Sequence, residues 1–408
     1  MKKQIYRSIK NEFDLNRRNF LKTGGLAGAG MLLGTPKLWA RDQRLGKSSK
    51  PKTNIDAALK IPRTKNSLPG LFPGRVVEVG DKVAMRKGRP QAAVIKKMFE
   101  QGLTTLTGKT PQESFHLFFN TRDMVGLKVN PVGPGLISTR PELVDAVIDW
   151  LTDNGLKKEN IIIWDRFDYM LAEAGYTAER YPGIAIEGLQ TMDEAAAEGK
   201  KKDNSAWLNQ DGSHISAPNF DKDVYYWADV EGAKDKPYLN QHVFNGKYSY
   251  FGKLLTKKLT KIINLPVFKN TGNGISMATK NLGYGAICNT NRLHRPLFFD
   301  VCAEVLAFPV IRDKLVLNIT DGLRAQYDGG PGAVAKYTWL FNTLFFATDP
   351  IALDMTCHNI LFEKRKNMNV KVNEHPRYTD YLRYAQRLGL GIADPQKIEH
   401  ICVHSSGY

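Results

Sequence analysis

Short apolar runs and helical repeats follow one another along the chain and predict alternating strands and helices. Each run is rich in β-branched or other apolar residues and gives way to polar residues or a turn signal. The predicted strands are 123–130, 161–164, 262–265, 315–320 and 343–348. Apolar residues at helical spacing predict helices as well. These are 91–103, 297–308, 376–388 and 395–400, with one more that begins at Asp349 as N-cap and Pro350.

The segment between the first two predicted strands has recognisable helix boundaries. Thr139 is the expected N-cap, Pro141 lies near the first turn, and Glu142 completes a capping box. Gly155 is a suitable stop. A strand, a helix and a strand at this spacing form a βαβ unit, in which the two strands are parallel. We therefore predict an α/β fold with a mostly parallel sheet and flanking helices.

Two segments depart from this pattern. Residues 41–70 are rich in Lys, Arg, Ser and Pro without periodicity, which predicts a linker or a draped arm. In 190–250 the alternation weakens and aromatic and polar residues increase, which predicts an inserted cap over the sheet. Its aromatic and histidine side chains either line a cleft or, as we favour, pack the insertion's own small core. They are Trp207, His214, Tyr225, Tyr226, Trp227, Tyr238 and His242. The folded domain is then expected to span 71–408.

The first forty residues resemble a bacterial twin-arginine export signal. The run from Asn16 to Lys22 (N-R-R-N-F-L-K) matches the signal pattern S/T-R-R-x-F-L-K except at its first position, and an uncharged stretch follows. We interpret 1–40 as a signal peptide cleaved after Ala40, with a membrane-anchored N-terminal helix as the alternative. The glycines at 25–30 follow no strand, so they are not a dinucleotide loop. The resemblance implies the export machinery as a partner and a periplasmic or cell-envelope location for a protein exported in the folded state.

Composition and charge limit the partners. Apolar residues at 42% and charged residues at 24% are typical of a globular protein. The net charge is +17, of which about +11 lies after residue 40, and this favours anionic partners. We expect no nucleic-acid partner, because the chain is predicted to be exported. The four cysteines form no C-x-x-C pair, so buried thiols or one or two disulfides are expected. They are Cys288, Cys302, Cys357 and Cys402.

Polar residues follow the predicted strands at the points where the strands end. Because the carboxyl ends of parallel strands meet at one edge of a sheet, these side chains are expected to gather in a cleft there. They are Lys128, Asn130, Asp165, Asn264, Lys269, Asn318, Asp321 and Asp349. Such a set suits an anion, a divalent metal ion, or both. Each residue alone also has a structural explanation, such as a helix cap for Asp349 or a turn for Asp321.

The stretch 261–285 is the most distinctive part of the chain. It begins as an apolar run and becomes polar and glycine-rich. Gly272 and Gly274 would let the backbone approach a ligand closely, while Lys269 and Lys280 suit an anionic group. An ordinary surface loop with solvated lysines is the alternative.

Five motifs in order resemble the DUF362 family, a bacterial and archaeal group of unassigned function. They are Gly126 to Asn130, Asn264 to Lys269, Ser276 to Gly283, Thr320 to Pro331, and Thr348 to Asp354. The resemblance covers about 120–360 and supports the choice of residues without implying a reaction. Members often carry a ferredoxin-like cluster segment. This chain lacks the cysteine motif, so an iron–sulfur cluster of its own is not expected.

Three functions are compatible with these features. We prefer an exported enzyme that acts on an anionic small molecule or glycan, with Asp321, Lys269 and Lys280 as catalytic residues. A lysine desolvated beside other cations has a lowered pKa and can take part in acid–base chemistry. The expected ligand-binding residues are Lys128, Asn130, Gly272, Gly274 and Asn281. Asp349 and Asp354 are candidate ligands of a divalent metal ion, because hard cations prefer oxygen.

The two other hypotheses are a redox accessory or cofactor-handling protein and a non-catalytic anion-binding protein of the envelope. Twin-arginine export favours the first of these. The absence of G-x-S-x-G, H-E-x-x-H and P-loop motifs favours the second. His294, which is flanked by Arg292 and Arg295, is a further candidate for the site.

Overall fold

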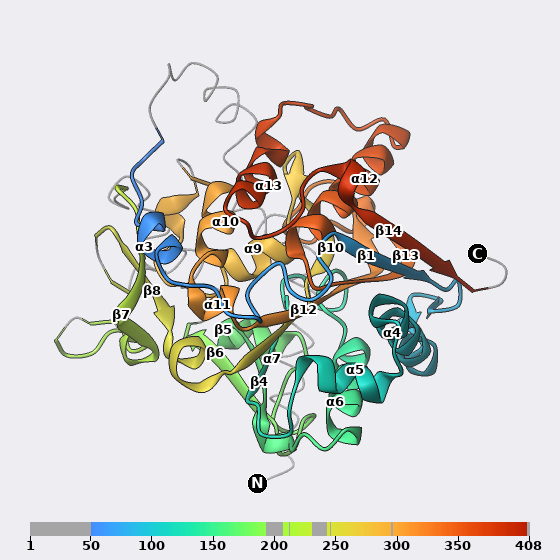
Figure 1. Cartoon of the computed structure of the whole chain (residues 1–408), viewed down its shortest axis with the longest axis horizontal. Helices are drawn as coiled ribbons and strands as arrows, with labels where there is room; N and C mark the ends of the chain where they lie inside the picture. Colours follow the sequence, from blue (N-terminus) through green and yellow to red (C-terminus); the bar gives the residue numbers. More distant parts are fainter. Residues whose placement is uncertain are drawn as a thin grey trace, which may run out of the picture.

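A computed structural model describes residues 50–192, 207–211, 213–230, 243–244, 246–294 and 297–405. The predicted signal at 1–40 lies outside the described residues, as do Tyr238, His242 and Arg295. A large sheet forms the centre, with the strand order β14-β1-β13-β12-β9-β4-β5-β6 (Figure 1). Its strands are β1 Arg75–Gly80, β4 Val125–Lys128, β5 Ile161–Phe167, β6 Ala185–Gln190, β9 Lys261–Asn264, β12 Leu315–Gln326, β13 Thr338–Ala347 and β14 Glu399–His404.

The predicted α/β fold with a mostly parallel sheet is confirmed. Strands β12, β9, β4, β5 and β6 are parallel neighbours, and β14 is parallel to β1. Only β13 runs against both of its neighbours in this order. Shorter strands complete the structure. Strand β10 Val267–Thr271 is parallel to β12 and antiparallel to β11 Gly274–Ile275. Two separate pairs are β2 Met85–Arg86 with β3 Arg89–Pro90, and β7 Phe220–Trp227 with β8 Tyr248–Gly252.

Helices cover both faces of the sheet (Figure 1). One face carries α4 Ala92–Thr107, α5 Pro111–Phe118, α6 Pro141–Asp153 and α7 Asp168–Glu173. The other face carries α9 Ala278–Gly283, α10 Asp300–Leu306, α11 Pro309–Arg312, α12 Pro350–Asn367 and α13 Arg377–Arg387. Shorter turns are α3 Ile55–Leu59, η2 Lys158–Asn160, η4 Ala217–Asn219, η7 Leu254–Lys258, η8 Asn291–Leu293, η9 Ala335–Tyr337 and η10 Pro395–Lys397.

The alternation of side chains along the strands explains the two cores. In β5, Ile161 and Ile163 pack with α4 to α7, whereas Ile162 and Trp164 pack on the opposite face. All seven residues of β5 are buried, as expected for a parallel strand covered by helices on both sides. Strand β5 therefore holds the polar residues at its end on a buried support.

The helix predicted after Pro141 exists, but its predicted cap is wrong. Arg140 is the N-cap of α6, and no side-chain cap hydrogen bond is made there. The Thr139 hydroxyl instead donates to the carbonyl of Leu265 over 2.6 Å and accepts from the Asn130 N–H over 2.8 Å. Because these bonds tie the loop to β9 and β4, the hydroxyl is not used as a cap. The carboxylate of Asp321, from β12, accepts the N–H of Arg140 just before the helix.

Three predicted boundaries also differ. The strand expected to end at Thr320 continues to Gln326, so Asp321 lies inside β12 and pairs with Leu344 of β13. The helix predicted at 297–308 begins at Asp300, and Pro309 starts a new short helix. Residues 395–400 form a 3-10 turn followed by β14, because pairing with β1 outweighs local helix preference.

The part of 41–70 that the structure describes is an arm that lies against the domain. The Lys50 ammonium pairs with the buried Glu304 carboxylate at 2.6 Å. The Arg63 guanidinium donates to the carbonyls of Leu388 and Gly389 after α13. These contacts hold the described part of this segment against the domain.

The described part of 190–250 carries the β7–β8 pair and packs directly on the main core. Tyr226 is buried, and its hydroxyl donates to Glu304 over 2.7 Å. Tyr225 makes edge contacts with the rings of Tyr248 and Tyr250. The described aromatic side chains therefore pack against one another and against the domain. Within the described ranges, none of the helices combines the length and apolar character needed to span a bilayer.

Candidate functional site

The carboxyl ends of β4, β5 and β9 bring polar side chains together, as the sequence predicts. Lys128 lies opposite Trp164 of β5 on one side and Asn264 of β9 on the other. Its ammonium group, which is only 1% exposed, forms an ion pair with the carboxylate of Asp165. It also donates to the Val129 carbonyl over 2.8 Å. The strand ends thus create a buried ion pair at one edge of the sheet.

Side-chain amides connect this ion pair to the neighbouring strands. The Asn281 side-chain oxygen accepts from Lys128 over 3.1 Å and from the Asn130 amide over 3.2 Å. The Asn281 amide donates to the Asn264 oxygen over 2.8 Å, and the Asn264 amide donates to Asn318 over 2.9 Å. Because these groups are hydrogen-bonded on several sides, they hold fixed positions.

Lys269 lies at the end of this network without a carboxylate beside it. Its ammonium donates to the Asn130 side-chain oxygen over 2.9 Å and is 1% exposed. Burial lowers the pKa of Lys269 to about 7, and the positive charges of Lys280 and Lys128 act in the same direction. Asp165 opposes the shift only in part. A lysine with this pKa is a neutral amine in a large fraction of molecules at neutral pH.

Two further cations border the same network. Lys280 of α9 has its ammonium 5.3 Å from the Tyr284 ring centroid and 5.8 Å from that of Phe298. Burial lowers the pKa of Lys280, and the charge of Lys128 lowers it further. Arg166 of β5 is 8% exposed, and one of its nitrogens, Nη1, donates to the Thr290 hydroxyl. Its Nε and Nη2 atoms have no hydrogen-bond partner among the described residues.

His294 belongs to the same neighbourhood. Burial lowers the pKa of its imidazole to about 3, and the charges of Lys280 and Arg166 contribute. The ring lies 4.5 Å from that of Tyr284, and Nδ1 lies 3.0 Å from the Thr290 carbonyl oxygen. The imidazole is therefore neutral at physiological pH. Arg292 points elsewhere and donates to the carbonyls of Ala228 and Val230.

Gly285 packs closely against the Lys128 side chain because it has no side chain of its own. A Cβ atom at this position would lie 2.5 Å from Lys128 Cε and 2.3 Å from the Asn281 carbonyl oxygen. Both contacts are far below van der Waals distance, and one of them is to backbone. Only glycine therefore permits this approach of the lysine to the loop.

The two glycines expected to bind a ligand have structural explanations. Gly272 has a φ of +54° in the turn between β10 and β11, and its carbonyl accepts from Arg365 over 2.8 Å. A Cβ on Gly274 would lie 2.5 Å from the Phe299 ring. The stretch 261–285 is not a surface loop. It folds into β9, β10, β11 and α9, and most of it is buried.

Asp321 lies apart from the lysines. Its carboxylate accepts from the Arg140 N–H over 2.8 Å and from the Leu323 N–H over 3.1 Å, and burial raises its pKa. Among the described residues, none of its ion pairs or hydrogen bonds reaches Lys128, Lys269 or Lys280. The carboxylate holds the start of α6 against the sheet.

The candidate metal ligands Asp349 and Asp354 each accept hydrogen bonds from backbone N–H groups. Asp349 accepts from the N–H groups of Ile351 and Ala352 as the predicted N-cap of α12, and from those of Gly74 and Ile392. Asp354 accepts from the Ala278 and Thr279 N–H groups at the start of α9. Burial raises the pKa of each to about 6. The last residue of β13, Ala347, is in register with Asn318, Asn264 and Lys128, so Asp349 follows β13 close to the level of Lys128 but three strands away.

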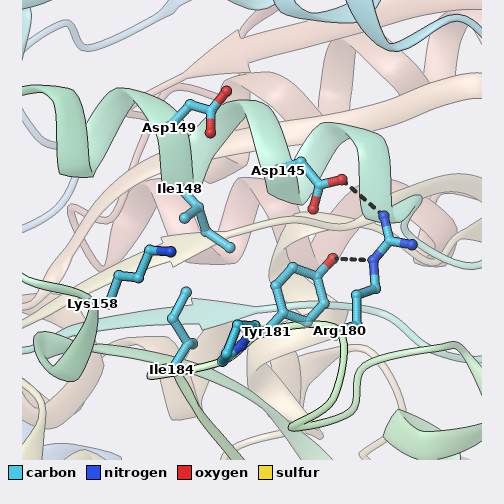
Figure 2. Close-up of a pocket in the computed structure, with 8 residues that line it drawn as sticks. Asp145, Ile148, Asp149, Lys158, Arg180, Tyr181 and Ile184 are labelled. Carbon is cyan, nitrogen blue, oxygen red and sulfur yellow. Dashed lines mark hydrogen bonds and ion pairs between the residues drawn. The ribbon is translucent and has the colours of Figure 1, made fainter.

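A surface hollow lies elsewhere. It has a volume of about 260 Å³ between α6 and the segment 180–184 (Figure 2). Arg180 in its wall forms an ion pair with Asp145 at 2.8 Å and donates to the Tyr181 hydroxyl over 3.2 Å. Asp149 is paired with Lys96 at 2.9 Å. These wall charges have partners within the chain, whereas those of Lys269 and Lys280 are not matched by any carboxylate in the described residues.

Sequence reasoning missed Arg166 as a member of the site. It lies one residue after Asp165, which was placed at the strand end, but β5 continues to Phe167. Alternation along β5 gives the signal, because it places Arg166 on the same face as Trp164, whose ring lies 5.4 Å from the Lys128 ammonium.

Comparison with known families supports two of these interpretations. The model described as "Domain of unknown function (DUF362)" matches residues 226–359, a shorter span than the expected 120–360. The matched span 226–359 contains Lys269, Lys280 and Asn281, whereas Lys128 and Arg166 precede this span. The model described as "TAT (twin-arginine translocation) pathway signal sequence" matches residues 14–34. This signal directs export by the twin-arginine route to the periplasm or envelope. Comparisons with curated proteins and with solved structures gave no significant match.

Proposed function

We propose that this exported protein, which carries a DUF362 domain, binds a small anionic molecule beside Lys269 and is an enzyme that moves a proton on it. The anion would be a carboxylate or phosphate group held by Arg166 and Lys280. Lys128 would add positive charge nearby, because its three N–H donors are already used within the chain. Asn130 and Asn281 would orient the lysines. Asp321, Asp349 and Asp354 are not part of the proposal, because their oxygens already accept backbone N–H groups.

The observation that carries the proposal is the excess of buried positive charge. The charges of Lys128 and Lys280 act on Lys269, and that of Lys128 acts on Lys280. Asp165 forms an ion pair with Lys128, and its charge also acts on Lys269 and Arg166. Burying an unpaired cation is costly unless an opposite charge offsets it. Two nitrogens of Arg166 also lack partners. A bound anion would supply both the charge and the hydrogen-bond acceptors.

The chemistry assigned to Lys269 follows from its pKa of about 7. A group whose pKa lies near the operating pH can both give up and accept a proton, so Lys269 can act as a general acid or base on bound substrate. The neighbouring cations stabilise negative charge that develops on the substrate. His294 is neutral and lies near Lys280, so it offers a hydrogen bond rather than a charge.

The first test is a ligand screen by thermal shift with sulfate, inorganic phosphate and small di- and tricarboxylates. We expect at least one anion to raise the Tm of the wild-type domain. Arg166→Met and Lys280→Met should reduce this response at least about tenfold in apparent affinity. The control is Lys97→Met, which changes an exposed lysine on α4. Equal responses in all four proteins would contradict the proposed site.

The second test separates an enzyme from a non-catalytic binding protein. Organic anions that raise the Tm are incubated with protein in deuterated water, and exchange of their carbon-bound hydrogens is followed by NMR. Exchange that is lost in Lys269→Met but kept in Lys97→Met would support proton transfer. Binding without exchange or turnover in any of these ligands would favour the non-catalytic anion-binding alternative.

A further inference from the structure

A second group of polar side chains lies on β14 and β1, at the other edge of the sheet. Glu78 and Cys402 are directly opposite each other in the parallel pairing of these strands. His400, Cys402 and His404 share one face of β14, because side chains alternate along a strand. Ile401 and Val403 point to the other face, where they pack against the core. The pairing therefore gathers a thiol, a carboxylate and imidazoles on the exposed face.

The distances within this group are short. The Nε2 atom of His400 lies 2.9 Å from Glu78 Oε2 and 3.6 Å from Cys402 Sγ. Cys402 Sγ lies 3.9 Å from the same carboxylate oxygen. One ligand atom from each of the three residues thus lies within 4.8 Å of the others. His404 Nε2 lies 3.7 Å from the second oxygen of Glu78.

We propose that Glu78, His400 and Cys402 form a binding site for a divalent metal ion of the zinc class. A thiolate, an imidazole and a carboxylate are all zinc ligands, with metal–ligand distances of about 2.0–2.3 Å. In a tetrahedral site these lengths place neighbouring ligand atoms about 3.3–3.8 Å apart. The observed separations of 2.9 to 3.9 Å are close to that range, so only small side-chain movements are needed.

The chemistry of the donors favours zinc over a hard cation. A thiolate and an imidazole bind borderline metals such as zinc, whereas magnesium and calcium require oxygen ligands. The site is also accessible, since the side chains of His400 and His404 are each 31% exposed and Cys402 is exposed. The other three cysteines are buried, so the one exposed thiol lies where these ligands gather.

A metal ion here would join the last strand to the first strand of the sheet. Because Glu78 belongs to β1 and the other two ligands to β14, the ion would bind the folded pairing and not the unfolded chain. Ligands that bind only the folded state raise its stability. The expected role is therefore structural, and it is independent of the lysine cluster.

The test uses the full-length domain without a histidine tag, stripped with a chelator and kept reduced with a non-thiol reductant. Zinc titration should give one equivalent bound, and cobalt should give a thiolate-to-metal charge-transfer band. Cys402→Ser and His400→Ala should each weaken zinc binding more than about tenfold and abolish the zinc-dependent rise in Tm. His116→Ala, at an exposed histidine of α5, is the matched control and should behave as wild type.

Magnesium at the same concentration should produce no rise in Tm. Circular dichroism of each variant without metal checks that it is folded, and Cys402→Ser is the mildest change because the side chain is exposed. The proposal is overturned if the wild-type protein binds no stoichiometric zinc. It is also overturned if Cys402→Ser and His400→Ala keep the wild-type affinity.

Discussion

The ammonium group of Lys269 donates a hydrogen bond of 2.9 Å to the side-chain oxygen of Asn130. This neutral amide replaces the carboxylate that a buried lysine would otherwise need, and burial keeps the pKa of Lys269 near 7. The amide acceptor orients the amine without neutralising it. An anionic ligand would therefore interact with an ammonium group of Lys269 whose charge Asn130 does not neutralise.

The lowered pKa of Lys269 should make the free energy of unfolding depend on pH. Between pH 7 and 10.5 the unfolded chain binds a proton at Lys269 that the folded protein has lost, so the free energy of unfolding rises with pH. The slope from this group is about 1.4 kcal/mol per pH unit at most. Chemical denaturation from pH 6 to 9.5 measures it. Lys269→Met should remove that slope, whereas Lys97→Met should keep it, and parallel profiles for all three proteins would refute the assignment.

Anion binding should be accompanied by proton uptake. A bound anion raises the pKa of Lys269, so at pH 8 the neutral amine takes up about half to one proton from the buffer. Sulfate is the preferred probe, because it does not titrate near neutral pH. Calorimetry in two buffers with different ionisation enthalpies measures the uptake. Lys269→Met should bind sulfate without uptake, and an unchanged uptake in this variant would assign the proton to another group.

Gly285→Ala should abolish the anion response by displacing Lys128. The new Cβ would lie 2.5 Å from Lys128 Cε, and we expect a destabilisation of about 1–3 kcal/mol together with loss of the ligand-induced rise in Tm. Gly135→Ala is the matched control, because this glycine has a φ of +73° and no neighbour within 4 Å of the added Cβ. It should cost about 1–2 kcal/mol from backbone strain and keep the anion response. Retention of the response in Gly285→Ala would contradict the role given to Lys128.

Asp349 should be important for stability rather than for metal binding. Alanine leaves four backbone N–H groups of the α12 cap and its neighbours without an acceptor, so the free energy of unfolding should fall by about 3 kcal/mol. Asp349→Asn retains one oxygen and should cost less, about 1–2 kcal/mol. Asp153→Ala, at an exposed acid, should be neutral. A magnesium-dependent stability that both Asp349 variants lose would instead support the metal role.

The sequence was sufficient for the elements whose signals are local. The helix that starts at Asp349 and Pro350 has its N-cap and first-turn proline as predicted. The run 161–164 identified β5, because a parallel strand buried on both faces is continuously apolar. The convergence of Lys128, Asn130 and Lys269 was also predictable, since parallel strands share one edge.

Pairing between distant segments could not be predicted in the same way. Residues 395–400 look helical by spacing, yet pairing with β1 makes most of them a turn and strand β14. Asp321 looks like a strand end because Gly322 follows it, but β13 extends the strand beyond it. Each of these features depends on a partner that lies far away in the sequence.

The position of β1 makes an early part of the chain depend on segments that lie far along it. β1 leaves the ribosome early, but β13 and β14, which flank it, come from the end of the chain. Until the last strand is released, β1 has an unpaired edge and an unsupported apolar face. Since the twin-arginine route carries folded proteins, a nascent or prematurely terminated chain would remain a poor export cargo. The sheet topology therefore makes the pairing of β1 depend on residues 338–404.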